Sequence, residues 1–187
     1  MRPRLEPTAI PGVRRIVPVR HGDERGYLSE VYRADVLREA GIVFDAVQEN
    51  HSYSRDAGTV RGLHFQLPPR AQAKLVRVVR GAVLDVAVDL RRDSPTFGRH
   101  VAVELSAESG EQLYVPAGFA HGFCTLEPQP EGVYLMDQTY APEHERGLLW
   151  NDPALGIVWP VAPEKAILSA KDRANPTLET LADPVFA

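Results

Sequence analysis

Apolar and polar residues alternate along the middle of the chain with the period of a β-strand. Over residues 84–91, apolar side chains at Leu84, Val86, Val88 and Leu90 alternate with Asp85, Ala87, Asp89 and Arg91. Successive side chains of a strand point to opposite faces, so this pattern predicts a strand that is buried on one face. Residues 74–80 form a run rich in β-branched residues that ends at Arg80-Gly81, which predicts a preceding strand and a turn.

Six further segments have strand-like patterns and are separated by turn residues such as Gly, Pro, Asp and Ser. We predict strands near residues 43–53, 59–66, 99–106, 111–115, 120–126 and 132–139. Only two segments resemble helices: residues 34–40, which end before a C-capping Gly41, and a turn or two after Pro176 within residues 175–181. Many short strands with few helices favour a sandwich or barrel, so we predict one all-β domain over residues 1–187.

Composition narrows the functional class. The 187 residues are 44% hydrophobic and 25% charged, as in an ordinary globular domain, and the net charge of −4 disfavours broad binding to nucleic acid or to a membrane surface. An anionic ligand must therefore be bound by arginines placed locally. The single Cys124 lies in an apolar run, which predicts a buried, unreactive thiol and a reducing compartment. No run of about 18 apolar residues or signal-peptide core is present, so we expect a cytoplasmic protein.

The segment from Arg61 to Gln66, Arg-Gly-Leu-His-Phe-Gln, combines a potential base with a fixed cation, and Lys74 follows ten residues after His64. A histidine titrates near neutral pH, and nearby cations stabilise negative charge on oxygen, so this set suits proton removal beside a carbonyl. His64 would need a carboxylate to orient its ring, and Asp172 is the candidate. The alternative is a core histidine bonded to backbone. Strict alternation places Arg61 and His64 on opposite faces, so a shared pocket requires a bend or bulge, which Gly62 would permit.

Downstream, Pro116-x-Gly118-x-x-His121 resembles the second motif of cupins, a superfamily with the jelly-roll fold, also called a double-stranded β-helix. In metal-binding cupins that histidine joins a His-x-His pair and a glutamate. Here Gln66 stands where the second histidine belongs, and no glutamate follows within the next ten residues. The three protein ligands of a catalytic metal site cannot be assembled from this motif pair, so we predict no metal.

A larger set of motifs runs in the order seen in the dTDP-4-dehydrorhamnose 3,5-epimerase family, which the chain resembles from about Ile10 to Asp172. The set comprises Asp23-Glu24-Arg25-Gly26, Gln48 to Ser52, Arg61 to Gln66, Lys74 to Arg77, Asp85 to Arg91, Ser94 to Gly98, Pro116 to Phe123, Trp150 to Pro153 and Leu168 to Asp172. The resemblance implies a cofactor-free jelly-roll homodimer in dTDP-rhamnose biosynthesis. Its substrate would be a nucleotide-linked 4-keto-6-deoxyhexose, with dTDP-4-keto-6-deoxyglucose converted to dTDP-4-keto-rhamnose. C3 and C5 both flank the C4 ketone, so each can lose a proton to give an enolate.

The resemblance also assigns roles to residues. It implies that His64 is the base, Asp172 its partner, Tyr134 the acid on the opposite face, and Lys74, with Arg61, the stabiliser of the enolate. The positions that match substrate-binding positions of the family are Arg25, Glu30, Gln48, Asn50, Arg61, His121, Glu145 and Lys171. An N-terminal segment of about residues 1–30 would make the dimer contact and carry Arg25 and Glu30 into the partner's pocket. A C-terminal tail would span about residues 168–187.

Two positions depart from the family pattern. Leu135 follows Tyr134 where the family has a lysine, and Thr139-Tyr140 stands where it has two tyrosines, both near the sugar and base by resemblance. Alternatives therefore stay open. They are an epimerase of C3 or C5 alone acting on a related nucleotide sugar, a metal-dependent cupin such as an isomerase or dioxygenase, and a non-catalytic sugar-binding jelly roll. The downstream pathway, whether polysaccharide or natural-product sugar, is also open.

Overall fold

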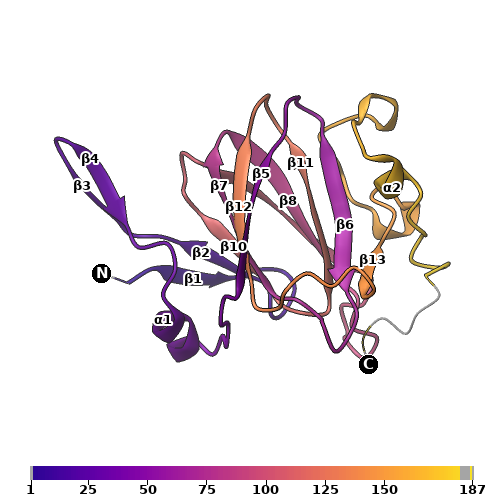
Figure 1. Ribbon diagram of the computed structural model, residues 1–187, viewed down its shortest axis with the longest axis horizontal. Helices are drawn as coiled ribbons and strands as arrows, with labels where there is room; N and C mark the ends of the chain where they lie inside the picture. The colour runs from indigo at the N-terminus through magenta and orange to yellow at the C-terminus, as the bar shows by residue number, and fades with distance from the viewer. Residues whose placement is uncertain (1, 182–185, 187) are drawn as a thin grey trace.

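Two antiparallel sheets face each other and form the body of the protein (Figure 1). The computed structural model describes residues 2–181 and 186. The first sheet has the strand order β1-β2-β10-β7-β12-β5 and the second has the order β13-β6-β11-β8-β9. A separate hairpin, β3-β4, projects away from both sheets (Figure 1). This two-sheet architecture confirms the predicted all-β jelly roll.

The elements are short, and most strands follow one another with brief connections. The strands are β1 (Arg4–Pro7), β2 (Arg14–Val17), β3 (Arg20–Asp23), β4 (Gly26–Ser29), β5 (Gln48–Tyr53), β6 (Val60–Gln66), β7 (Lys74–Arg80), β8 (Ala82–Asp89), β9 (His100–Ser106), β10 (Gln112–Val115), β11 (Phe119–Thr125), β12 (Glu131–Met136) and β13 (Glu145–Gly147). The helices are α1 (Ala34–Glu39) and α2 (Ala170–Arg173), with 3-10 turns η1 (Pro153–Leu155) and η2 (Pro163–Lys165).

All eight predicted strands are present, and β7 has the predicted bounds. Two predictions were too long: the strand predicted at 43–53 begins at Gln48, and the one predicted at 132–139 ends at Met136. Before Gln48 the residues also alternate between buried and exposed, as Phe44 (2% exposed) and the exposed Val43 show, but they form an irregular link. The alternation alone therefore made this predicted strand too long. Strands β1 to β4 and β13 were not predicted, because strands of three or four residues are too short to leave a clear alternation in the sequence.

Helix α1 ends as the sequence predicts. Gly41 has a φ of +81°, its N–H donates to the Arg38 carbonyl at 3.0 Å, and the Ile42 N–H donates to the Leu37 carbonyl at 2.9 Å. This pair of bonds is a Schellman motif, in which glycine takes the left-handed position. The predicted position of the C-terminal helix was wrong. Helix α2 ends at Arg173, and residues 175–181 contain one turn, in which the Thr180 N–H donates to the Thr177 carbonyl.

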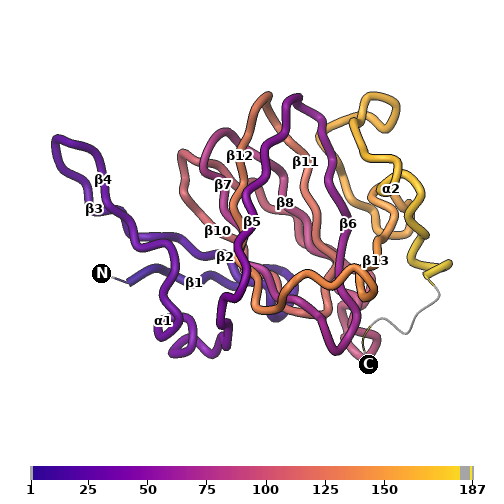
Figure 2. Tube along the Cα trace, in the orientation of Figure 1, coloured from indigo at the N-terminus to yellow at the C-terminus, as the bar shows by residue number. Residues whose placement is uncertain are grey.

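Strand β8 is buried on both faces, which corrects the expectation of a half-buried strand. Its inward face carries Asp85 and Asp89, both 0% exposed, while Val86 and Val88 point outward into a second apolar cluster. That outer cluster is completed by residues of the C-terminal segment, including Leu148, Leu155, Leu178 and Leu181. Figure 2 traces this segment along the outer side of the sheet that contains β6. The segment therefore supplies a third layer that the alternation within β8 does not reveal.

The interior between the sheets is apolar at one end and polar at the other. Along β7 the inward side chains change from Lys74 through Val76 to Val78, and both valines join the central cluster. A separate cluster around Phe44 and Leu75 packs the α1 region on the outer face of the first sheet. Cys124 is 0% exposed, which confirms its predicted burial, and this burial raises the pKa of the thiol to about 11.

No helix within residues 2–181 is long and apolar enough to cross a membrane.

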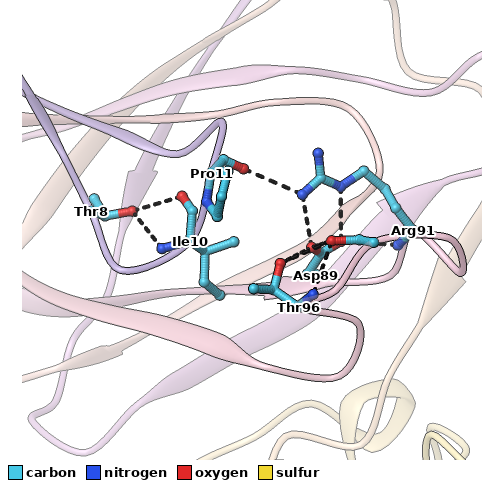
Figure 3. Close-up of polar contacts among 7 residues, drawn as sticks. Thr8, Ile10, Pro11, Asp89, Arg91 and Thr96 are labelled. Atoms are coloured by element: carbon cyan, nitrogen blue, oxygen red, sulfur yellow. Dashed lines mark hydrogen bonds and ion pairs between the residues drawn. The ribbon is translucent and has the colours of Figure 1, made fainter.

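A buried carboxylate ties the β8-β9 loop to the N-terminal turn (Figure 3). Asp89 accepts hydrogen bonds from Arg91, Ser94 and Thr96 at 2.6–2.9 Å, and Arg91 also donates to the Pro11 carbonyl. Burial alone would raise the pKa of Asp89, but these hydrogen bonds outweigh it and lower the pKa from 3.8 to about 2. The ionised carboxylate thus stabilises the folded state.

Replacing Asp89 with asparagine is expected to lower the free energy of unfolding by about 2 kcal/mol at pH 7. Because the folded-state pKa lies below the unfolded one, the contribution of Asp89 is complete above about pH 4 and is lost as the pH falls toward 2. Urea unfolding of both proteins between pH 7 and pH 3 measures this difference, which should shrink by about half at pH 3. Asp93→Asn, an exposed change in the same loop, is the control. A difference independent of pH would contradict this account.

Candidate active site

The polar end of the interior opens into a cleft between the two sheets. Two adjoining cavities of ≈ 140 and ≈ 270 Å³ make up the cleft, and His64, Lys74 and Tyr134 line both of them. Because the three side chains are shared, the two cavities form one continuous site. The cleft therefore gathers the base, the cation and the acid that the family resemblance implies.

A β-bulge in β6 brings Arg61 and His64 to the same cleft. His64 lies opposite His121 on β11, but Arg61 lies opposite Phe123, so β6 carries one more residue than its partner over this stretch. Gly62 has a φ of +121°, and a Cβ there would lie 2.7 Å from the Gly122 Cα. An extra residue turns the following side chains to the other face. The bend predicted at Gly62 is confirmed.

His64 and Asp172 form a dyad. The His64 Nε2 atom lies 2.6 Å from Asp172 Oδ1, and Asp172 is 4% exposed. Ser169 caps α2 by accepting the Asp172 N–H at 3.0 Å, which fixes the carboxylate beside the ring. Burial raises the pKa of Asp172, but the hydrogen bond and charge of His64, with the Ser169 bond, hold it below its usual value. The carboxylate is ionised and accepts the Nε2 proton, which leaves Nδ1 as the basic atom.

Lys74 is a buried cation next to the dyad. Its side chain extends from the start of β7, is 9% exposed, and donates to the His64 carbonyl at 3.4 Å. Burial lowers the pKa of Lys74 from 10.5 to about 8, although the negative charges of Asp85 and Glu145 oppose the shift. Near neutral pH the ammonium is therefore charged although the residue is buried. A charge so placed interacts strongly with a developing oxyanion.

Tyr134 lies on the opposite wall from His64. It is on β12 of the six-stranded sheet, whereas His64 is on β6 of the five-stranded sheet, and both line the two cavities. The Tyr134 hydroxyl accepts a hydrogen bond from Asn50 Nδ2 at 3.2 Å. A basic ring and a phenol therefore face the same space from different sheets. Such a pair can remove a proton from one face of a planar centre and return one to the other.

Six of the predicted substrate-binding residues lie in the cleft. Gln48, Asn50 and Glu145 line the smaller cavity, and Arg61, His121 and Lys171 line the larger one. Lys171 Nζ lies 2.5 Å from Glu145 Oε2, so these two side chains from different segments meet at the edge of the site. Arg61 is held by the Ser54 hydroxyl and the Tyr53 carbonyl.

Arg25 and Glu30 line neither of these cavities. The Arg25 side chain is 83% exposed at the tip of the β3-β4 hairpin, where it pairs with Asp23 at 2.5 Å. Glu30 pairs with Arg33 at 3.5 Å. Within one copy of the chain, these two residues therefore do not reach the cleft in which they are predicted to bind substrate.

The two departures from the family pattern differ in their positions. Leu135 packs against the outer cluster around Phe44 and Leu75, on the face of the sheet opposite to Tyr134. The expectation that Leu135 lies near the sugar was wrong, because adjacent strand residues point to opposite faces. Tyr140, by contrast, lines the smaller cavity, and its hydroxyl donates to Glu145 at 2.7 Å.

Sequence reasoning missed the partner of His121. Both oxygens of Asp85 contact His121 Nε2, at 2.9 and 3.0 Å, and both residues are buried. A second histidine–carboxylate pair thus lies directly across the strands from His64. The available signal was the alternation in β8, which places Asp85 on the same face as Ala87. The prediction of a half-buried strand placed that face of β8 toward solvent.

Comparisons with known proteins agree with one another. A protein-family model described as dTDP-4-dehydrorhamnose 3,5-epimerase matches residues 7–180. A curated dTDP-4-dehydrorhamnose 3,5-epimerase of Sinorhizobium fredii is 52% identical over 170 residues, covering 91% of this chain and 87% of the relative. A solved enzyme of that name from Bacillus anthracis, with TDP and PPi bound, is 48% identical with a TM-score of 0.91, over 94% and 99% of the two chains. A 3,5-epimerase from Legionella pneumophila, in complex with dTDP-4-keto-L-rhamnose, is 42% identical with a TM-score of 0.91, over 96% and 94%.

Proposed function

Because the chain belongs to the dTDP-4-dehydrorhamnose 3,5-epimerase family, we propose that it inverts C3 and C5 of dTDP-4-keto-6-deoxyglucose to give dTDP-4-keto-rhamnose. The observation that carries the proposal is the shared cleft, in which His64 and Tyr134 face each other from different sheets beside a buried Lys74. Relatives about 50% identical over most of the chain have this activity.

The first step is proton removal next to the ketone. His64 takes the proton from C3 through Nδ1, the C–H electron pair forms a C3–C4 double bond, and O4 becomes an enolate oxygen. Asp172 stabilises the imidazolium that results, because its carboxylate already accepts the Nε2 proton at 2.6 Å. The Lys74 ammonium, with Arg61, stabilises the charge on O4.

The second step returns a proton to the other face. Tyr134 donates its hydroxyl proton to C3 from the opposite wall, the enolate collapses to the ketone, and the configuration at C3 is inverted. Solvent then takes the extra proton from the His64 imidazolium and returns a proton to the Tyr134 phenolate. The same sequence at C5 completes the reaction, and the overall balance of atoms and electrons needs no cofactor.

Incubation with dTDP-4-keto-6-deoxyglucose in D₂O tests this function and its regiochemistry. Deuterium is expected at both C3 and C5 of the product, measured by NMR and mass spectrometry. Incorporation at one carbon alone would assign a single-centre epimerase instead. If neither carbon gains deuterium, the chain is not an epimerase of this substrate.

The rate is expected to fall in alkaline solution, because Lys74 stabilises the enolate only while it is charged. The pKa of Lys74, about 8, predicts that kcat/KM is near its maximum at pH 7 to 8 and decreases by about tenfold at pH 9. In Lys74→Arg the cation stays charged across this range, so the alkaline limb should move above pH 9, although the rate at pH 7 is lower. The measurement is the pH profile of kcat/KM for both proteins. An unchanged alkaline limb in Lys74→Arg would assign it to another group.

We also propose that residues 1–187 form one domain that works as a homodimer, with about residues 1–30 making the contact. The β3-β4 hairpin projects from the body, and exposes Tyr27 by 60% and Leu28 by 75% (Figure 1). Burial of these side chains in a second copy would also bring Arg25 and Glu30 toward the partner's cleft, where an arginine suits a diphosphate.

Light scattering is expected to give a dimer, and Arg25→Ala is expected to raise KM. A fully active monomer would rule this out.

The free, buried Cys124 fits a reducing environment, and we propose that the enzyme acts in the cytoplasm.

A further inference from the structure

The segment just after β12 forms part of the cleft wall and is held by side chains instead of a strand partner. Gln72 Nε2 donates to the Gln138 carbonyl at 2.8 Å. Gln66 Nε2 donates to the Thr139 carbonyl at 3.3 Å, and Gln66 Oε1 accepts from the Ala141 N–H at 2.8 Å. The Tyr140 N–H donates to Gln48 Oε1 at 2.8 Å. Each of four consecutive residues, 138–141, is thus bound by a glutamine side chain.

The three glutamines reach this segment from both sheets. Gln48 begins β5 at the edge of the six-stranded sheet, Gln66 ends β6 of the five-stranded sheet, and Gln72 lies in the link between β6 and β7. All three line the smaller cavity. Gln66 is 3% exposed and also donates to the Arg70 carbonyl at 2.6 Å, so both the NH₂ group and the oxygen of its amide are hydrogen-bonded. A buried amide with all its partners in place has one preferred position.

Gln66 occupies the position at which metal-binding cupins carry a second histidine. Here its side chain bonds to three backbone groups, so the position serves to hold a neighbouring segment. This explains why the His-x-Gln pattern combines a reactive residue with an uncharged amide two residues later.

The segment carries Tyr140, whose position depends on these bonds. The Tyr140 ring is 53% exposed and lines the smaller cavity. Its hydroxyl donates to Glu145, which in turn pairs with Lys171. The backbone of Tyr140 is fixed by the glutamines and its hydroxyl by Glu145, so the ring is held at both ends as a rigid wall of the cleft.

We propose that Gln66 and Gln72 are positioning residues that fix Tyr140 as a wall of the cleft and thereby set substrate affinity, without taking part in proton transfer. This inference rests on the proposed function. The reacting ring must lie among His64, Lys74 and Tyr134, so a nucleotide-linked sugar has to extend beyond them. A wall that is preorganised lowers the cost of ordering the site around that extension.

The test is a comparison of Gln66→Leu and Gln72→Leu with the wild-type enzyme. Each variant is expected to raise KM by about fivefold to tenfold while kcat stays within about twofold, because the loss falls on binding and not on the chemical step. The dissociation constant for dTDP, measured by calorimetry, should rise in parallel. The matched control is Gln112→Leu, which removes another buried glutamine that donates to the Val31 carbonyl at 2.8 Å, away from the cleft. It should lower the melting temperature and leave KM unchanged.

A double-mutant cycle separates positioning from general stability. If the glutamine acts through Tyr140, then Gln72→Leu should have no further effect on KM in a Tyr140→Ala background. Additive effects, a wild-type KM in both leucine variants, or a fall in kcat alone would each overturn the inference. Failure of the proposed function is distinct, because the wild-type enzyme would then show no epimerisation at all.

Discussion

Replacement of His64 with alanine is expected to lower kcat by about 10³-fold, because among the described residues that line the cleft no other basic side chain occupies its position. The ring is held by Asp172 at 2.6 Å, so removal of the imidazole also leaves a buried carboxylate without its partner. Substrate binding depends on other residues, so KM is expected to change little. Steady-state kinetics with the dTDP-linked keto-sugar measure both constants.

The control for this change is His51→Ala, which removes an exposed histidine that pairs with Glu131 on β12. Its activity should match the wild type. Added imidazole is expected to restore part of the activity of His64→Ala, because a small base can occupy the space that the side chain leaves. A loss smaller than tenfold, with the fold intact, would remove His64 from the role of base.

Tyr134→Phe is expected to separate hydrogen exchange from inversion. The variant keeps the ring and loses only the hydroxyl that accepts from Asn50, so the cleft retains its shape. His64 can still remove a proton and return a deuteron to the same face, whereas delivery to the opposite face loses its donor. We therefore expect formation of the inverted product to fall by about 10²–10³-fold while deuterium still enters the unreacted substrate.

NMR in D₂O follows both processes in one sample, with the label in recovered substrate reporting exchange and the new diastereomer reporting inversion. Tyr53→Phe, on the edge strand and exposed, serves as the control and should change neither rate. Equal losses of exchange and inversion would show that Tyr134 contributes to proton removal as well. Undiminished inversion would assign the acid to another residue.

Most of the sheet framework is predictable from residue alternation, because long strands bury one face in a regular way. The alternation in β8 predicted the strand correctly. It did not predict that both faces are buried, because the residues that cover Val86 and Val88 lie in the C-terminal segment. The exposed hairpin β3-β4 has no apolar alternation to read. Local patterns therefore predict elements, while the layers depend on segments far away in the chain.

Much of the site could be anticipated from the order of the family motifs, although the residues that these motifs supply lie on both sheets and on α2. Gly62 indicated the bend that turns Arg61 and His64 to one cleft, and the bulge is present. Asp85 was missed, because an inward carboxylate and a solvent-facing one have the same place in an alternating pattern. Leu135 was misplaced for a related reason: a match to a family motif gives the order of residues, whereas strand geometry decides which of two neighbours faces the ligand.

The carboxylate that contacts His64 comes from a distant part of the chain. Asp172 lies 108 residues beyond His64, on the same segment that seals the outer face of the five-stranded sheet. During synthesis on the ribosome, the strands emerge before this segment does, so strand pairing that takes place at that stage leaves the His64 imidazole without its carboxylate partner. Proteolytic cleavage before α2 would likewise remove Asp172 and leave His64 without its carboxylate, although the strands of both sheets would remain.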